Sequence, residues 1–204
     1  MPAMIGGFRR GVCDPMLIAG VDEAGRGPWA GPVVAAAVIL RGAVPPGLGD
    51  SKTLSERRRE QLFAALAASD ALIGVGQASV AEIDALNILQ ANHLAMSRAV
   101  EQLGVAPELV LVDGNRLPTW RWPARAIVGG DGLEPAISAA SIVAKVTRDR
   151  IMADLDALHP GYGWADNQGY GTARHRAGLE LLGITPHHRR SFAPIKAMIT
   201  ESGL

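Results

Sequence analysis

The sequence predicts an α/β domain with a mixed central sheet flanked by helices. Short apolar runs of strand length alternate along the chain with longer segments whose apolar residues recur every three or four positions. Strands that alternate with helices pack as one sheet covered by those helices. The chain of 204 residues is 48% hydrophobic and 20% charged, which is ordinary for a globular protein. We therefore expect a single domain over residues 1–204.

Five strands are expected in chain order. Residues 17–21 and 33–40 are short apolar runs separated by a Gly/Pro-rich connection, which is typical of two neighbouring buried strands. Residues 72–77 and 109–112 are two further apolar runs of strand length. Residues 126–128 are a weaker candidate, because the run is short.

Helices are expected where a capping residue precedes an apolar stripe. Thr53 and Ser79 each stand three residues before a glutamate, which is the spacing of a capping box, and the first of these helices is predicted to run to about residue 68. Apolar residues at helical spacing predict two longer helices over residues 87–103 and 135–159. Residues 161–171 read as a Gly-rich loop, after which Thr172 caps a helix that ends at Gly183.

Acidic residues follow three of the predicted strands. Asp22 and Glu23 end the first strand, Asp113 ends the fourth, and Asp131 follows the fifth. Adjacent carboxylates point to opposite faces of a regular strand, so one site can use both Asp22 and Glu23 only if the backbone turns there. The glycines at 25 and 27 supply that turn. The acids can then converge on one edge of the sheet.

A cluster of carboxylates favours a hard divalent cation. Like charges at a buried site raise one another's pKa, and a cation removes that conflict. Mg²⁺ and Mn²⁺ bind through a few carboxylates, water and phosphate oxygens. Cys13 is the only cysteine, and no Cys/His cluster has the spacing of a zinc site. Taken singly, each acid can also be an ordinary exposed turn residue.

The charge pattern alone does not identify a partner. The net charge is zero, but residues 167–204 carry five Lys/Arg side chains against two glutamates. This cationic end could follow a phosphate backbone, or it could be a solvated surface. The glycines near residue 25 do not match a dinucleotide-binding motif, because the spacing is wrong and a strand follows where that motif needs a helix.

The expected location is the cytosol. A lone cysteine excludes an intrachain disulfide and fits a reducing compartment. The apolar stretch 33–40 is far shorter than the roughly 20 residues that span a bilayer, so no membrane segment is expected. Residues 1–16 lack the apolar run of a secretory signal. Nothing indicates an obligate interface, and we expect a monomer.

Six segments resemble one known family. The run VDEAGRG at 21–27 closely resembles the signature of ribonuclease HII, the type 2 ribonuclease H family. Further matches follow in the family's order: DSKTLS at 50–55, LVDGN at 111–115, AASIVAKVTRD at 139–149, GYGT at 169–172 and HRRSF at 188–192. They span nearly the whole chain, so the resemblance is specific.

The resemblance implies a ribonuclease H-like fold with a C-terminal helical extension, about 172–204, that helps to hold a duplex. It implies an endonuclease that cuts the RNA strand of RNA/DNA hybrids and single ribonucleotides embedded in duplex DNA. Asp22, Glu23, Asp113 and Asp131 match the family's catalytic acids, which would hold two Mg²⁺ or Mn²⁺ ions about 4 Å apart. The products would carry 5′-phosphate and 3′-hydroxyl ends. The Gly-Gly approach to Asp131 predicts that it is the most dispensable of the four.

The resemblance also implies residues that bind the substrate. Gly25, Arg26 and Gly27 match the loop that senses the 2′-hydroxyl, the group that distinguishes RNA from DNA. Tyr170 matches a tyrosine that stacks near the sugar after the ribonucleotide. The implied phosphate contacts, each of which taken alone reads as a helix cap or a solvated charge, are Ser51, Lys52, Ser141, Lys145 and Arg148.

Two positions depart from the family's pattern. Gly129 stands where many members carry lysine, and Asn167-Gln168 stand where a His-Lys pair is common. Both changes remove positive charge, so we expect weaker or more salt-sensitive duplex binding than is usual for the family. Two alternatives remain: a non-catalytic nucleic-acid-binding domain, which would bind without metal, and a structure-specific DNA nuclease on the same fold, which would cut all-DNA substrates.

Overall fold

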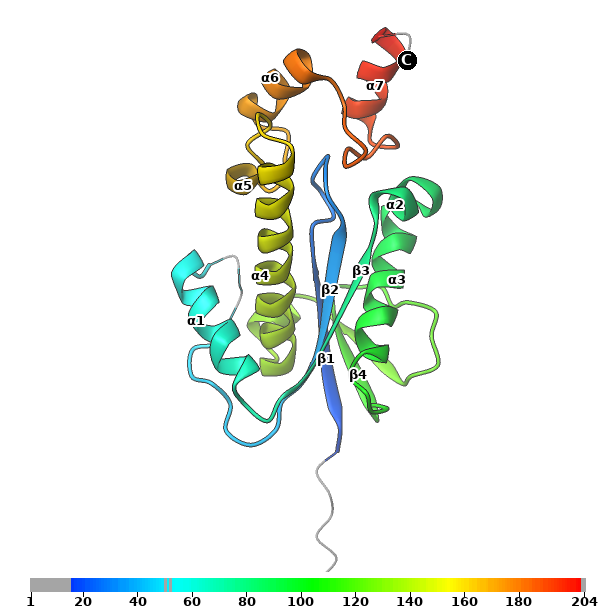
Figure 1. Ribbon diagram of the computed structural model, residues 1–204. Coiled ribbons are helices and arrows are strands. Elements are labelled where there is room, and N and C mark those ends of the chain that lie inside the picture. The colour runs from blue at the N-terminus through cyan, green and yellow to red at the C-terminus, as the bar shows by residue number, and fades with distance from the viewer. Residues whose placement is uncertain (1–15, 50, 52, 203–204) are drawn as a thin grey trace, which may run out of the picture.

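The computed structural model describes residues 16–49, 51 and 53–202 and has a five-stranded sheet at its centre (Figure 1). The strand order is β3-β2-β1-β4-β5. The strands are β1 (Ile18–Ala24), β2 (Val33–Ile39), β3 (Leu72–Ala78), β4 (Leu109–Asp113) and β5 (Ala124–Ile127). The helices are α1 (Glu56–Ala67), α2 (Val80–Leu86), α3 (Ile88–Glu101), the 3₁₀ turn η1 (Gly130–Gly132), α4 (Pro135–Leu158), α5 (Trp164–Asn167), α6 (Ala173–Leu182) and α7 (Ala193–Ser202).

The sheet is mixed, as the sequence predicted. β1 pairs with β2, and β2 with β3, in antiparallel fashion, whereas β1 pairs with β4, and β4 with β5, in parallel. β1 is therefore the central strand and β4 is its parallel neighbour. The carboxyl ends of parallel strands meet at the same edge of a sheet, which is where the predicted acidic residues stand.

Helices cover both faces of the sheet, with α1 and α4 on one side and α3 on the other (Figure 1). Alternate residues of β2 serve the two faces: Ala36 and Val38 pack in the core beneath α4 and α1, whereas Ala35 and Ala37 pack in the core beneath α3. Small side chains on this strand let both helices lie close to the sheet. The same alternation on β1 turns Gly20 toward α4, where an added Cβ would lie 2.1 Å from the Ala136 carbonyl carbon.

The C-terminal helices α5, α6 and α7 lie beyond the end of the sheet where β1 stops and β2 begins (Figure 1). They enclose a small hydrophobic core of their own. Its buried members come from α4 and its continuation, from α6 and α7, and from the connection between β1 and β2: Ala30, Met152, Tyr162, Trp164, Leu179 and Ile195. This core therefore attaches the C-terminal part to the β1–β2 connection and to the end of α4.

Several local predictions are confirmed and three need correction. The capping box at Ser79 is present, and Thr172 caps α6. The cap of α1 is Ser55 instead of Thr53, because the helix begins at Glu56 and the Ser55 side chain accepts the Arg58 N–H. The fifth strand is β5, shifted toward the N-terminus from 126–128.

The third correction is α5, a single turn inside the segment predicted to be a Gly-rich loop. It starts after Gly163 and ends at Gln168, which both have left-handed backbone conformations. Short turns bounded by glycine lack the apolar period that reveals longer helices. No helix in the described part of the chain is long and apolar enough to span a membrane.

Candidate active site

The ends of β1 and β4 bring Asp22 and Asp113 side by side. The parallel register pairs Val21 with Val112, so each acid is the next residue along its strand. β1 stays regular through Ala24, with Asp22 and Glu23 still paired to β2. The predicted turn comes only at Gly25, whose φ is 96°. Glu23 nevertheless lines the same cavity as Asp22 and Asp113.

Asp22 is the most perturbed carboxyl of the site. It is 4% exposed, and its pKa is raised well above the usual value, first by burial and then by the charges of Glu23 and Asp113. The Glu23 backbone N–H donates to Asp22 Oδ1 at 2.7 Å, and this bond and the nearby Ser141 side chain partly offset the rise in the pKa of Asp22. The Glu23 N–H therefore orients a carboxyl group whose charged form is disfavoured by burial and by the neighbouring acids.

The loop after β5 connects Asp113 to Asp131. The Gly130 N–H donates to Asp113 Oδ1 at 2.8 Å. Asp131 follows in η1 and is 8% exposed, and the Ser138 hydroxyl of α4 donates to its backbone carbonyl. Asp131 is close to the cluster through this loop, but among the described residues it does not line the cavity formed by the other three acids.

A cavity of about 280 Å³ joins the acids to most of the residues predicted to bind substrate. Its lining comes from the end of β1 and the loop after it, from β4, from α4 and from the loops before α1 and α6: Asp22, Glu23, Ala24, Gly25, Arg26, Gly27, Ser51, Asp113, Ser141, Lys145, Arg148 and Tyr170. Of the predicted site residues, Asp131 is outside this lining, and Lys52 lies outside the described residues.

The donor set fits a hard divalent cation bound partly through water. Within the described ranges, no three His, Cys, Asp or Glu side chains are arranged to hold a metal ion by themselves. Mg²⁺ does not require such a cage, because it keeps several waters and binds through one or two carboxylates together with substrate phosphate. Asp22 and Asp113 are close enough for the charge of one to raise the pKa of the other. A cation between them would remove that repulsion.

The Gly25–Gly27 loop follows the acids directly, and close neighbours leave no room for a side chain at Gly25 and little room at Gly27. An added Cβ on Gly25 would lie 1.9 Å from Arg148 Nε, and one on Gly27 would lie 3.2 Å from Tyr170 Cε1. The Tyr170 ring therefore lies against the Gly27 backbone and is 51% exposed toward solvent. Arg26 pairs with Glu23 at 3.2 Å.

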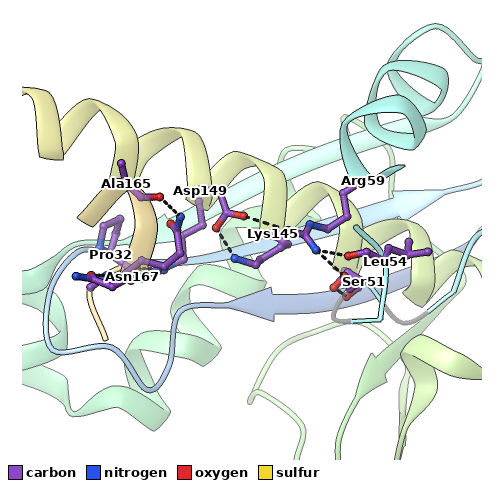
Figure 2. A network of polar contacts seen from close by, with 12 residues as sticks. Pro32, Ser51, Leu54, Arg59, Lys145, Asp149, Ala165 and Asn167 are labelled. Carbon is purple, nitrogen blue, oxygen red and sulfur yellow. Dashed lines mark hydrogen bonds and ion pairs between the residues drawn. The ribbon is translucent and has the colours of Figure 1, made fainter. Parts of the chain in front are cut away.

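The predicted phosphate contacts occupy different environments. Ser51 and Ser141 are both buried, and their hydroxyl oxygens lie 2.6 Å apart at the cavity wall. Figure 2 shows an ion pair between Lys145 and Asp149. Arg59 donates hydrogen bonds to the carbonyls of Ser51 and Leu54, and its Nη2 lies 4.0 Å from Asp149 Oδ2. This network fixes the loop before α1 against α4.

Arg148 points into the protein. It is 2% exposed, and its guanidinium donates to the carbonyls of Ala30, Pro32 and Gln168 at 3.0–3.2 Å. Arg189 is also fully buried, at 0% exposure, and also donates to backbone carbonyls. By sequence alone it belongs with the cations of the C-terminal end. Composition does not distinguish a buried arginine from a solvated one, so this feature was missed. Its only signal was its place in the motif at 188–192.

Comparison with known proteins identifies the family of this chain. The sequence model of the family described as Ribonuclease HII matches residues 19–195. A ribonuclease HII of Sphingopyxis alaskensis is 62% identical over 179 residues, which cover 88% of this chain and 90% of that protein. A ribonuclease HII of Rhizorhabdus wittichii is 59% identical over 185 residues, covering 90% and 91% respectively.

Solved structures show the same fold. Ribonuclease H2 from Pyrococcus horikoshii OT3 superimposes with a TM-score of 0.78 at 28% identity, covering 91% of this chain and 98% of that one. Bst-RNase HIII, solved in complex with Mn²⁺, has a TM-score of 0.69 at 18% identity over 92% of this chain and 70% of that one, a likeness of fold alone.

The fold and the acidic cavity define a nuclease of the ribonuclease H type. The family match covers most of the chain, and close relatives align over nearly their whole length. The chain therefore belongs to the ribonuclease HII family.

Proposed function

We propose that this chain hydrolyses the phosphodiester bond on the 5′ side of a ribonucleotide paired with DNA, in RNA/DNA hybrids and at single ribonucleotides within duplex DNA. The observation that carries the proposal is the shared cavity: three carboxylates from β1 and β4 face the loop and tyrosine that would recognise a ribose. We further propose that the protein acts as a monomer in the cytosol.

Asp22, Glu23 and Asp113, with Asp131 behind them, would hold Mg²⁺ or Mn²⁺ together with substrate phosphate. When bound, the metal supplies a water of lowered pKa and stabilises negative charge on the leaving oxygen. Water attacks phosphorus, the bond from phosphorus to the 3′ oxygen breaks, and that oxygen takes up a proton. The products then carry 5′-phosphate and 3′-hydroxyl ends. Because Asp131 is outside the cavity lining, we assign it the smallest contribution of the four.

The Gly25–Gly27 loop would read the 2′-hydroxyl. We assign the sugar contact to the backbone groups of the loop, whose Gly25 and Arg26 carbonyls each accept one hydrogen bond from Arg189 and keep a second lone pair. The Tyr170 ring, which is half-exposed and lies beside Gly27, would stack on the neighbouring sugar.

Phosphate contacts are proposed for the polar groups on the cavity wall: Ser51, Ser141 and Lys145, and also Lys52 from the sequence pattern. We assign Arg148 a supporting part, because its guanidinium is occupied by backbone carbonyls. The exposed cations of the 172–204 part, Arg174, Arg176, Arg190 and Lys196, would contact the backbone of the duplex.

The test is cleavage of a labelled DNA duplex that carries one ribonucleotide, with Mg²⁺, with Mn²⁺ and with chelator. An all-DNA duplex, an Asp22→Asn variant and an Asp154→Asn variant are run beside it, since Asp154 is an exposed residue of α4. We expect a metal-dependent cut 5′ of the ribonucleotide in the wild type and in Asp154→Asn only. Binding without cleavage would favour a non-catalytic domain, and cutting of the all-DNA duplex would favour a different nuclease.

A further inference from the structure

One short segment near the C-terminus is docked on the connection between β1 and β2. His188 forms an antiparallel bridge with Ala30, the Arg189 N–H donates to the Trp29 carbonyl at 2.8 Å, and the Gly31 N–H donates to the His187 carbonyl at 2.9 Å. Successive side chains of an extended segment point to opposite sides. His188 and Arg189 are both almost fully buried, so they reach two different parts of the site.

Arg189 holds the Gly25–Gly27 loop. Its Nη2 donates to the Gly25 carbonyl at 2.6 Å, Nη1 to the Arg26 carbonyl at 2.9 Å, and Nε to the Gly31 carbonyl at 2.9 Å. A guanidinium presents its five donors in a rigid plane, so contacts with two successive carbonyls fix the orientation of both peptide groups. A lysine ammonium could carry the same charge without imposing that geometry.

His188 begins a hydrogen-bond chain whose direction is determined. The Thr185 backbone N–H lies 2.9 Å from His188 Nδ1 and can only donate, so Nδ1 accepts. A neutral His188 therefore carries its proton on Nε2, which faces His175 Nε2 at 3.1 Å. Burial and the neighbouring histidine His175 lower the pKa of His188 to about 3, which agrees with the neutral form.

The chain ends at the tyrosine of the site. His175 Nε2 also receives the Trp164 indole N–H at 3.1 Å, so it is an acceptor and the His175 proton is on Nδ1. That Nδ1 donates to the Tyr170 carbonyl at 3.0 Å. Each bond thus has a single donor direction from Thr185 to Tyr170.

The two side chains therefore reach the two elements to which ribose recognition is assigned in the proposed function. Arg189 is bonded to the loop, His188 is linked through His175 to Tyr170, and the loop and the tyrosine ring meet at Gly27. Because the two residues are consecutive, the backbone of one segment sets the spacing between these elements.

We propose that His188 and Arg189 are positioning residues that hold the Gly25–Gly27 loop and Tyr170 at a fixed separation and thereby determine which bond beside a ribonucleotide is cut. This inference rests on the proposed function. It assigns neither residue to metal binding or to phosphate contact.

The variants are chosen to separate geometry from charge and size. Arg189→Lys keeps the charge but loses the planar donors. His188→Asn keeps an acceptor for the Thr185 N–H but loses the donor to His175, whereas His188→Gln can place an amide N–H where Nε2 stands. Arg150→Lys is the control, because this arginine lies on the outer side of α4 and pairs with Glu60.

The first readout is the position of cleavage on a duplex with four consecutive ribonucleotides and on one with a single ribonucleotide. For Arg189→Lys and His188→Asn, we expect the ratio of the preferred cut to all other cuts to fall about tenfold or more, since misplacement by about 1 Å is costly to a reaction. KM for the duplex should stay near the wild-type value. His188→Gln and Arg150→Lys should keep the wild-type ratio.

The second readout is amide hydrogen exchange without substrate. We expect faster exchange at residues 25–27 in Arg189→Lys and at 169–171 in His188→Asn, with the sheet unchanged. Unchanged cleavage ratios would overturn the positioning role. So would an equal fall in the cleavage rate at every position, in proportion to the loss of thermal stability. Failure of the wild type to cut would overturn the proposed function instead, and the exchange data would still decide whether these residues position the loop and the tyrosine.

Discussion

Gly20 controls how closely α4 approaches the strand that carries Asp22. In a Gly20→Ala variant the new Cβ would lie 2.1 Å from the Ala136 carbonyl carbon and 2.2 Å from the Ile137 nitrogen. Both atoms belong to the backbone, so no side chain can rotate away. The first turn of α4 must therefore move outward by about 1.5 Å, since packed atoms sit about 3.5–4.0 Å apart.

The displacement should affect both stability and activity. Overpacking of this kind costs about 1–3 kcal/mol, and each kcal/mol lowers the melting temperature by about 2–4 °C in a domain of this size. The same helix carries Ser138, which donates to the Asp131 carbonyl, and Ser141, which lines the cavity together with Asp22. A shift of more than about 1 Å between these partners and Asp22 should lower kcat at least about 100-fold.

Gly74→Ala is the matched control. Its Cβ would lie 2.1 Å from the Ala99 carbonyl oxygen, so it forces the same conflict between β3 and α3, on the other face of the sheet. The melting temperature should fall by a comparable amount in both variants. Single-turnover cleavage at 20 °C should be slow only for Gly20→Ala. Wild-type kcat in Gly20→Ala, or an equal loss in Gly74→Ala, would show that the approach of α4 to β1 does not position the acids.

Three further outcomes are expected. The pKa of Asp22 is raised in the folded protein, so the ionised carboxylate destabilises the folded state above that pKa. With chelator present, Asp22→Asn should have a higher melting temperature than the wild type at pH 8. The difference between the two melting temperatures should become smaller toward pH 4. The pKa of His188 is lowered to about 3, so the free energy of unfolding should fall as the pH drops below about 6.5, by up to about 1.4 kcal/mol per pH unit. Urea unfolding at pH 7 and pH 5 would measure this fall. The His188→Asn variant should lose less stability between the two pH values than the wild type. Gly129 has a φ of 68°, so Gly129→Lys should lower the free energy of unfolding by about 1–2 kcal/mol. The same variant should steepen the plot of log binding constant against log salt concentration by about 0.9 for the duplex. An unchanged slope would show that this position does not contact the duplex.

The positions of Asp22 and Asp113 could be predicted from the sequence because they depend on local patterns. An apolar run that reaches Asp22 or Asp113 indicates a buried strand, and parallel pairing then brings the two acids together, although β1 continues through Ala24. The four-residue strand β5 was misplaced because it is only partly buried and has no clear alternation of apolar and polar residues. Local patterning is weak where burial is incomplete.

The environment of Arg189 could not be predicted because it depends on contacts across the whole chain. Its acceptors are carbonyls of residues 25, 26, 31 and 32, more than 150 positions away. Backbone carbonyls exist at every residue, so no side-chain pattern marks the ones that will surround a buried cation. The directed chain from His188 to Tyr170 has the same origin, since it needs the folded positions of Thr185, His175 and Trp164.

The docking of residues 187–189 on residues 29–31 also has a consequence for biosynthesis. A growing chain acquires β1, β4 and α4 before it acquires this segment, and contacts between such distant parts of a chain form late because they close long loops. A nascent chain can therefore place Asp22 and Asp113 side by side while the carbonyls of Gly25 and Arg26 still lack their guanidinium partner. The docking of residues 187–189 is thus the step at which the loop beside the acids receives its final support.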